Sequence, residues 1–177
     1  MSRVRLIGST RIYSGDISLR KDKFSLDGRV IEKEIVEHKQ SVGIVPIIGD
    51  NVLLVSQYRH AAGKTLLEIP AGKMETGETP RRAAVREMAE EIGYEGSLKP
   101  LTKFYLAPGY DTEFMHVFIA TRLKKTKRGI LDEDEDIAIR RCKLDTALKK
   151  CIDGDIRDCK TIAALLAYSH LVAHKRV

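Results

Sequence analysis

The sequence lacks any continuous apolar run near the length that a bilayer requires. Crossing a membrane takes about 20 mainly apolar residues in a helix, whereas 32% of the residues in this 177-residue chain are charged and interrupt every candidate segment. The first residues, MSRVRLIGSTRIYSG, also lack the apolar core and small-residue cleavage pattern of an export signal. These absences exclude a membrane-spanning protein and lead us to expect a cytoplasmic location.

Metal-binding and disulfide-forming side chains are also few. The three cysteines, Cys142, Cys151 and Cys159, show no C-x-x-C spacing, which excludes both a closed zinc site and an even disulfide framework. We expect ordinary reduced thiols. The five histidines show no ligand spacing either, so structural or surface roles are expected for His38, His60, His116, His170 and His174.

Aromatic residues make up only 6% of the chain, although its formal charge is +6. A nucleic-acid interface would call for clustered Lys and Arg, and here these residues are dispersed among 25 acidic ones. We interpret the charge as a solvated surface that also attracts small anionic molecules. No nucleic-acid partner is expected.

The length suits one compact domain carrying a small extra element. Residues 3–37 alternate between apolar and polar in the manner of strands, and Asp27-Gly28 provides a tight turn before the run from Arg29 to Val36. We therefore predict an N-terminal antiparallel β extension at residues 1–38 and a main domain at residues 39–177.

The main domain mixes strands and helices. Two apolar runs, Val42–Ile48 and Val52–Gln57, flank Gly49-Asp50-Asn51 and predict a hairpin. Further strands are expected at 102–107, 114–121 and 137–142, and helices at 80–92, 144–153 and 161–174, the first two ended by Gly93 and Gly154. These elements predict an α/β (α+β) fold in which a mixed β-sheet is sandwiched between helices.

The helix predicted at Pro80–Ile92 carries an apolar stripe, formed by Val85, Met88, Ala89 and Ile92, and an acidic one. On a helical wheel Glu91 is turned about 40° from Glu87, and Glu90 about 60° the other way, so three carboxylates share one face beside Arg86. Two carboxylates about 5 to 6 Å apart repel by roughly 3 kcal/mol at an effective dielectric constant near 20, and a divalent cation between them reverses that sign.

A solvated acidic helix face is the simpler interpretation, because exposed like charges cost little. The preceding loop decides against it. From Gly72 the chain continues GKMETGETPRRAAVREMAEEIGY, which resembles the Nudix box at every fixed position: Gly72, Glu78, Arg86, Glu87, Glu90, Glu91 and Gly93. Only Tyr94 departs from the pattern, where the family usually has an aliphatic residue that packs the helix end.

The resemblance implies a site for Mg²⁺ or Mn²⁺ that hydrolyses a nucleoside diphosphate linked to another group. It implies Glu87 and Glu91 as the main metal ligands, with Glu90 assisting, also in catalysis, and Glu78 reaching back from the loop. The backbone carbonyl of Ala71 is similar to a ligand of one branch of the family. Arg86 would hold the glutamates by charge-assisted hydrogen bonds.

The flanking segments resemble the ADP-ribose pyrophosphatase branch of the family. The carrying segments are Gln57-Tyr58-Arg59, Leu67-Glu68-Ile69-Pro70-Ala71-Gly72 and Tyr105-Leu106-Ala107-Pro108-Gly109. The resemblance therefore implies hydrolysis of ADP-ribose to AMP and ribose 5-phosphate. It also implies a homodimer formed by exchange of N-terminal strands.

Candidate substrate-binding residues follow from these segments. An arginine at the end of a strand is suited to bidentate phosphate contact, so Arg59 is interpreted as a phosphate ligand rather than a plain surface residue. Gln57, Glu113 and Pro108 are further candidates, and Arg29 is a candidate for reaching a neighbouring subunit's site. The acidic loop 132–136 would by default be a solvated run. Its position resembles the loop that supplies a catalytic glutamate in this branch, which implies Glu135 as the first candidate for the base that activates water and Glu133 as the second.

Two alternatives remain open from the sequence. The nearer one is another Nudix hydrolase that acts on a nucleotide sugar, a dinucleotide or an oxidised nucleoside triphosphate. The other is a non-catalytic Nudix module that senses a nucleotide and controls a partner. That second alternative calls for the loss of box glutamates, and all of them are retained.

Overall fold

The computed structural model describes residues 4–15, 17–126 and 137–174. The chain divides into two compact units. The first comprises Met1–Gln40 together with Tyr105–Phe114, and the second comprises Ser41–Phe104 together with Met115–Val177. The N-terminal extension therefore includes a later stretch of chain, 105–114, that no local sequence pattern ties to it.

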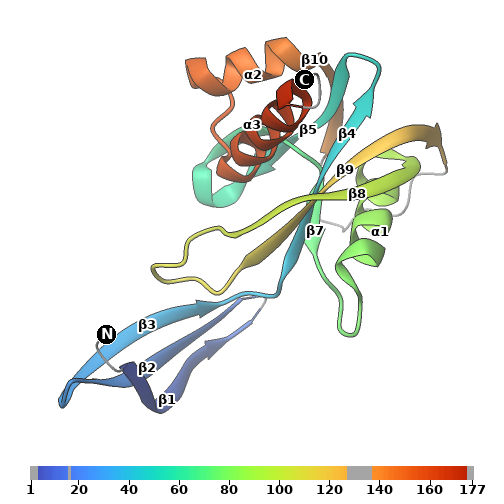
Figure 1. Cartoon of the computed structure of the whole chain (residues 1–177). Helices are drawn as coiled ribbons and strands as arrows, with labels where there is room; N and C mark the ends of the chain where they lie inside the picture. The colour runs from blue at the N-terminus through green and yellow to red at the C-terminus, as the bar shows by residue number, and fades with distance from the viewer. Residues whose placement is uncertain (1–3, 16, 127–136, 175–177) are drawn as a thin grey trace. The chain divides into compact units, whose positions relative to one another are not determined.

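The first unit is built on an antiparallel sheet with the order β1-β2-β3, formed by β1 (Val4–Ser14), β2 (Ser18–Leu26) and β3 (Arg29–Glu37) (Figure 1). The predicted turn joins β2 to β3. Asp27 and Gly28 both have positive φ, at 49° and 83°, as expected for a two-residue turn whose twist matches that of the strands it joins.

Residues 105–114 attach to β3 through backbone hydrogen bonds. Val36 N donates to Tyr110 O at 2.7 Å, and Thr112 N donates to Val36 O at 3.1 Å. The Oγ1 of Thr112 also accepts a hydrogen bond from His38 N at 2.9 Å. These contacts bind the connection between β8 and β9 to the last residues of the N-terminal sheet.

The second unit holds a seven-stranded sheet with the order β10-β5-β4-β9-β8, in which β6 pairs with β5 and β7 with β4. Its strands are β4 (Ser41–Ile48), β5 (Asn51–Arg59), β6 (Lys64–Glu68), β7 (Ala71–Lys73), β8 (Tyr94–Tyr105), β9 (Phe114–Lys125) and β10 (Ile137–Lys143). The pair β4/β9 is parallel, and β4/β7, β5/β6 and β10/β5 are antiparallel. The predicted mixed sheet is confirmed.

Three α-helices cover this sheet in the described part of the chain: α1 (Pro80–Ile92), α2 (Leu144–Asp153) and α3 (Cys159–His174). Figure 1 shows α1 on one face of the sheet and α2 and α3 on the other. Because side chains alternate along a strand, Val42 and Ile44 of β4 pack with α1 in the core cluster. The predicted sandwich is therefore observed, and a three-residue helix, η1 (His60–Ala62), follows β5.

Several element bounds differ from the prediction. The strand predicted at 102–107 begins at Tyr94 and ends at Tyr105, so its first half was missed. It contains Pro100, which is tolerated because β8 is the last strand in the order and lies at the sheet edge. The short strands β6 and β7 were also missed, and α3 begins two residues earlier than predicted. Within the described ranges, no helix is both long and apolar enough to cross a membrane.

Candidate metal and diphosphate site

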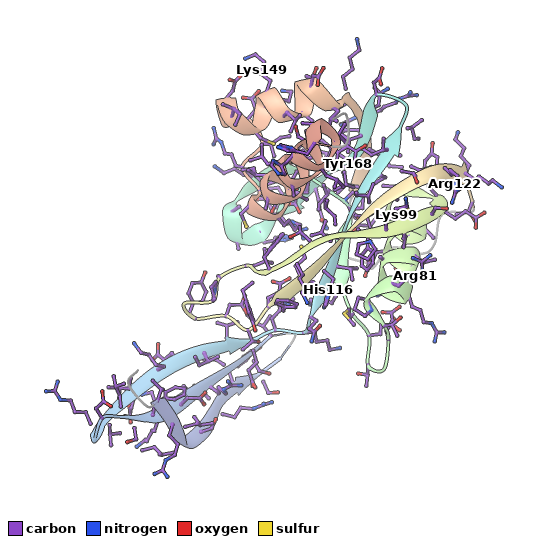
Figure 2. All side chains as sticks on the ribbon, in the orientation of Figure 1. Arg81, Lys99, His116, Arg122, Lys149 and Tyr168 are labelled. Carbon is purple, nitrogen blue, oxygen red and sulfur yellow. The ribbon has the colours of Figure 1, made fainter. Side chains whose placement is uncertain are left out.

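The helix α1 is fixed at both ends by local sequence signals. Thr79 is its N-cap, with Oγ1 accepting a hydrogen bond from Arg82 N at 3.3 Å, and Pro80 occupies the first turn. Gly93 ends it in the left-handed conformation with φ 66°. On one side, Arg81 reaches β8 and donates from Nη1 to Leu98 O at 2.9 Å (Figure 2).

The buried apolar side of α1 is displaced from the predicted stripe, because it includes Ala83 and Ala84 and leaves out Val85. Ala84, Met88 and Ile92, four residues apart, are buried in the core cluster, whereas Val85 is 43% exposed. Including Val85 in the stripe was wrong, because it lies about 100° from Ala84 on the helix. Burial of a side chain such as Met88 is worth about 1.5 to 3 kcal/mol, and this packing orients the acidic face.

Arg86 is the centre of that acidic face. Its Nη1 donates to Glu87 Oε1 at 2.7 Å and to Glu90 Oε2 at 2.9 Å. The Nε and Nη2 atoms donate to the two oxygens of Glu78 at 3.2 and 3.1 Å, and Nη2 also reaches Lys73 O at 2.9 Å. One guanidinium therefore ties three of the box glutamates to the loop that precedes the helix.

The pKa values of this cluster reflect the ion pairing. Burial acts to lower the pKa of Arg86, but the hydrogen bonds to Glu78 and the charge of Glu87 outweigh it, so the pKa is raised. The hydrogen bonds from Arg86 lower the pKa of the Glu78 carboxyl. Arg86 thus remains a cation, and Glu78 remains a carboxylate at neutral pH.

Ala71 and Gly72 lie against the carboxylates of α1. Ala71 N donates to Glu91 Oε2 at 3.2 Å. A Cβ atom built on Gly72 would stand 2.1 Å from Glu87 Cδ, so any larger residue would displace that carboxylate. Both residues belong to β7, whose pairing with β4 fixes their backbone.

The donor set fits a hard divalent cation. Glu78, Glu87, Glu90 and Glu91 offer carboxylate oxygens and Ala71 a backbone carbonyl, the ligands that Mg²⁺ and Mn²⁺ prefer. Two of the carboxylates, Glu87 and Glu91, are buried, where a negative charge is costly. A bound divalent cation would offset the negative charge of these carboxylates. Within residues 4–15, 17–126 and 137–174, no three His, Cys, Asp or Glu side chains already converge on one point.

Arg59 ends β5 and is held on one side by a buried carboxylate. Its Nε and Nη2 donate to the two oxygens of Glu68 at 2.8 and 2.7 Å. The Glu68 side chain is 1% exposed, and that of Arg59 is 38% exposed. The hydrogen bonds to Glu68 are the largest cause of the raised pKa of Arg59, and the negative charge of Glu91 contributes to the same shift.

Sequence reasoning missed the residues that surround Glu68. Lys160 Nζ bonds to Glu68 Oε2 and donates to Asp158 Oδ1 at 2.8 Å. Asp158 caps α3, with Oδ2 accepting from Thr161 N at 2.9 Å. An Asp immediately before the first residue of an apolar helical run is a helix-start signal, and Asp158 could have indicated this cap.

The other substrate-binding candidates have different surroundings. Gln57 is only 7% exposed, within β5 of the second unit. Arg29, Pro108 and Glu113 belong to the first unit. Arg29 is exposed at the start of β3, and the Oε2 of Glu113 lies 3.6 Å from His38 Nδ1.

Pro108 lines an open pocket of about 380 Å³ in the first unit. Its other walls include Phe24, Tyr110 and the ion pair of Arg20 with Asp22. Hydrogen bonds, first from Ser9 and then from Arg20, lower the pKa of Asp22. The candidate bases Glu133 and Glu135 lie outside the described residues.

The NUDIX domain model matches residues 37–163, a range that contains α1, the loop before it and the strand that carries Arg59. The chain belongs to the Nudix family. The predicted family is confirmed, and with it the prediction of a pyrophosphohydrolase.

Two relatives match most of the chain. It is 36% identical to the methanol dehydrogenase activator of Bacillus methanolicus, over 97% of this chain and 96% of the relative. It is also 36% identical to the ADP-ribose pyrophosphatase of Bacillus subtilis (strain 168), over 91% and 90%. A crystal structure of an ADP compounds hydrolase has the same fold, with a TM-score of 0.87 at 22% identity over 98% of this chain and 96% of that one. The predicted Nudix fold is confirmed.

Proposed function

We propose that this Nudix protein hydrolyses ADP-ribose to AMP and ribose 5-phosphate with Mg²⁺ or Mn²⁺ as its cofactor. The observation that carries the proposal is the cluster of box glutamates around Arg86, with Gly72 leaving room for Glu87. The name of the Bacillus subtilis relative supports ADP-ribose as the substrate. In this reaction water adds to one phosphorus and the bridging P–O bond breaks.

Each residue of the proposed site has a separate role. Glu87, Glu91 and the carbonyl of Ala71 would hold the metal, with Glu90 and Glu78 assisting. When bound, the cation binds pyrophosphate oxygens, lowers the pKa of a water molecule and offsets charge on the leaving phosphate. Arg86 keeps the carboxylates in place, and Arg59 binds the diphosphate. Glu135, or Glu133 in second place, would accept the proton from water.

A product assay tests the proposal. We expect AMP and ribose 5-phosphate from ADP-ribose in Mg²⁺ or Mn²⁺, and none after addition of EDTA. NAD, GDP-mannose and an oxidised nucleoside triphosphate complete the panel. Rapid hydrolysis of one of these compounds without hydrolysis of ADP-ribose would contradict the proposed substrate. It would not contradict the proposed metal site. Activity that persists in EDTA would contradict the proposed metal site.

A second candidate function is activation of an alcohol dehydrogenase. It is favoured by the Bacillus methanolicus relative, which the chain matches over nearly its whole length. Addition of this protein to the methanol dehydrogenase of that organism, in the presence of NAD, would then raise its rate of methanol oxidation. The Glu91→Gln variant tells whether such activation depends on the metal site.

We also propose a homodimer that forms through the N-terminal sheet. The first unit exposes by at least 44% the side chains of Val4, Leu6, Ile7, Ile12, Tyr13, Ile17 and Val30, and a concentration of exposed apolar side chains is typical of a protein interface. Sedimentation should give a dimer for the unsubstituted protein and a monomer for Ile12→Lys/Val30→Glu. Ile152→Lys, at a 75% exposed position in α2, is the matched control and should remain dimeric.

A cytoplasmic location is proposed as well. All three cysteines are free thiols, which suits a reducing compartment.

A further inference from the structure

A chain of four charged side chains runs from the end of β5 to the start of α3. Arg59 pairs with Glu68, Glu68 with Lys160, and Lys160 with Asp158. Positive and negative groups alternate, so the four charges sum to zero. The side chains of Glu68, Lys160 and Asp158 are 1%, 11% and 12% exposed, and only Arg59, at 38%, reaches far into solvent.

The contact between Arg59 and Glu68 fixes the direction of the guanidinium. Both oxygens of Glu68 receive hydrogen bonds, from Nε and Nη2. Because the guanidinium is planar and rigid, the Nη1 group must point away from Glu68. That outer edge is the one available for a phosphate oxygen.

The same cluster also holds the segment between β6 and β7, which leads to the candidate metal ligand Ala71. Thr161 Oγ1, beside the Asp158 cap, accepts a hydrogen bond from Ile69 N at 2.8 Å. Next along the chain, Pro70 O accepts from Ile44 N at 2.9 Å. Ala71 N then donates to Glu91. One continuous set of contacts thus holds both Arg59 and the candidate metal ligand Ala71.

We propose that Glu68 and Lys160 are positioning residues for Arg59, which hold its outer edge toward the diphosphate of the substrate. Lys160 keeps the Glu68 carboxylate charged and in one orientation, and Glu68 holds Arg59. The inference rests on the proposed function, because it assigns Arg59 to the diphosphate. Neither residue touches the substrate.

Stability alone does not account for this cluster. Buried ion pairs are often replaceable by apolar side chains of similar volume without loss of stability, since desolvation offsets their attraction. Orientation is a different matter. A phosphate contact from one edge of Arg59 needs the opposite edge to be held, and an apolar residue at 68 cannot do that.

The experiment compares Glu68→Gln with the double variant Glu68→Gln/Lys160→Met. The single change leaves a buried lysine without its main carboxylate, so the melting temperature should fall. The double change removes one charge of each sign and should recover most of that fall. In both variants the residue at position 68 can no longer accept hydrogen bonds from Arg59 on two carboxylate oxygens. Both should therefore bind the diphosphate less tightly.

Two measurements report on binding. We expect KM for ADP-ribose to rise about tenfold in both variants with little change in kcat, because a contact made equally in ground and transition states affects KM alone. The Kd of α,β-methylene ADP-ribose with Mg²⁺, measured by calorimetry, should rise by a similar factor. Lys160→Met alone keeps the Arg59–Glu68 pair and should give a smaller rise. Lys150→Met is the matched control, since Lys150 pairs with Asp155 at the surface.

A cycle with Arg59→Lys tests whether Glu68 acts through Arg59. In that background Glu68→Gln should change the Kd less than about twofold, because the guanidinium to be held is gone. A full tenfold change there would overturn the proposal. So would a double variant that regains both its melting temperature and its affinity, since the role would then be structural only.

Failure of the proposed function has a separate signature. It would show as absence of AMP release from ADP-ribose by the unsubstituted protein in Mg²⁺. The positioning role fails instead when the unsubstituted protein binds the methylene analogue and Glu68→Gln binds it equally well.

Discussion

Gly72 and Glu87 fit together without room for a further carbon atom between them. A Cβ at position 72 would lie 2.1 Å from Glu87 Cδ and from its Oε1. The backbone of Gly72 cannot retreat easily, because it pairs with Val42 in the sheet. The first glycine of the box therefore leaves the buried Glu87 carboxylate in its place, and an unusual φ angle is not the reason for it.

The first prediction concerns Gly72→Ala. The new methyl group should push the Glu87 carboxylate out of place, and displacement of a metal ligand should lower kcat/KM for ADP-ribose by about 100-fold. Overpacking at this buried contact should also lower the free energy of unfolding by about 1 to 3 kcal/mol. Steady-state kinetics and urea unfolding measure the two effects.

Gly8→Ala is the control for that variant. A Cβ at Gly8 would meet only Lys23 Cβ at 3.9 Å, an ordinary contact distance. Stability and kinetics should stay close to those of the unsubstituted protein. Equal losses in Gly8→Ala and Gly72→Ala would remove the steric argument.

The second prediction concerns Arg86→Lys. A single ammonium cannot reach Glu78, Glu87 and Glu90 together as the guanidinium does, so the carboxylates should lose their fixed arrangement. We expect kcat to fall by about 10- to 100-fold. Arg82→Lys, on an exposed position of the same helix, should be nearly silent. Similar kinetics for the two variants would show that only the positive charge of Arg86 matters, and not the geometry of its guanidinium.

Much of the site could be predicted because its signals are local. The bounds of α1 follow from Pro80 and Gly93, and the shared face of Glu87, Glu90 and Glu91 follows from helix geometry alone. The turn at Asp27-Gly28 is equally local. Each of these features depends on residues within a few positions of one another.

The rest depends on contacts between distant parts of the chain. Glu68 and Lys160 are 92 positions apart, and neither position carries a periodic pattern that points to the other. The strand β7 has three residues, too few for alternation to be visible. The burial of Glu91 was also missed. A helical wheel gives the direction in which a side chain points, but not which part of the chain packs against it.

The third prediction concerns Glu91→Gln. The glutamine retains an oxygen that can accept the hydrogen bond from Ala71 N, and burying a neutral amide costs less than burying a carboxylate. The metal-free protein should therefore remain folded. Loss of a charged ligand should lower turnover by at least about 100-fold.

The metal dependence of the melting temperature checks this variant independently of activity. A ligand that binds only the folded state raises its stability, so Mg²⁺ should raise the melting temperature of the unsubstituted protein more than that of Glu91→Gln. Glu95→Gln, an exposed position after α1, should keep the full effect. An undiminished Mg²⁺ effect in Glu91→Gln would show that the cation binds elsewhere.

The fourth prediction concerns acid unfolding and Glu68. Burial by itself raises the pKa of this carboxyl, but the hydrogen bonds and charges of Arg59 and Lys160 outweigh it and lower the pKa from its ordinary value of 4.5. A lowered pKa in the folded state means that the unfolded state takes up the proton first as pH falls. The contribution of Glu68 to stability is thus full above pH 4.5 and is lost as pH falls toward the folded-state pKa.

The carboxyls of Asp22, Glu78 and Asp155 also have lowered pKa values, so the whole protein should lose stability in acid. Comparison with Glu68→Gln/Lys160→Met isolates the part due to Glu68: urea unfolding at a series of pH values should give a shallower acid slope for the double variant, and identical slopes would mean that Glu68 has the same pKa folded and unfolded.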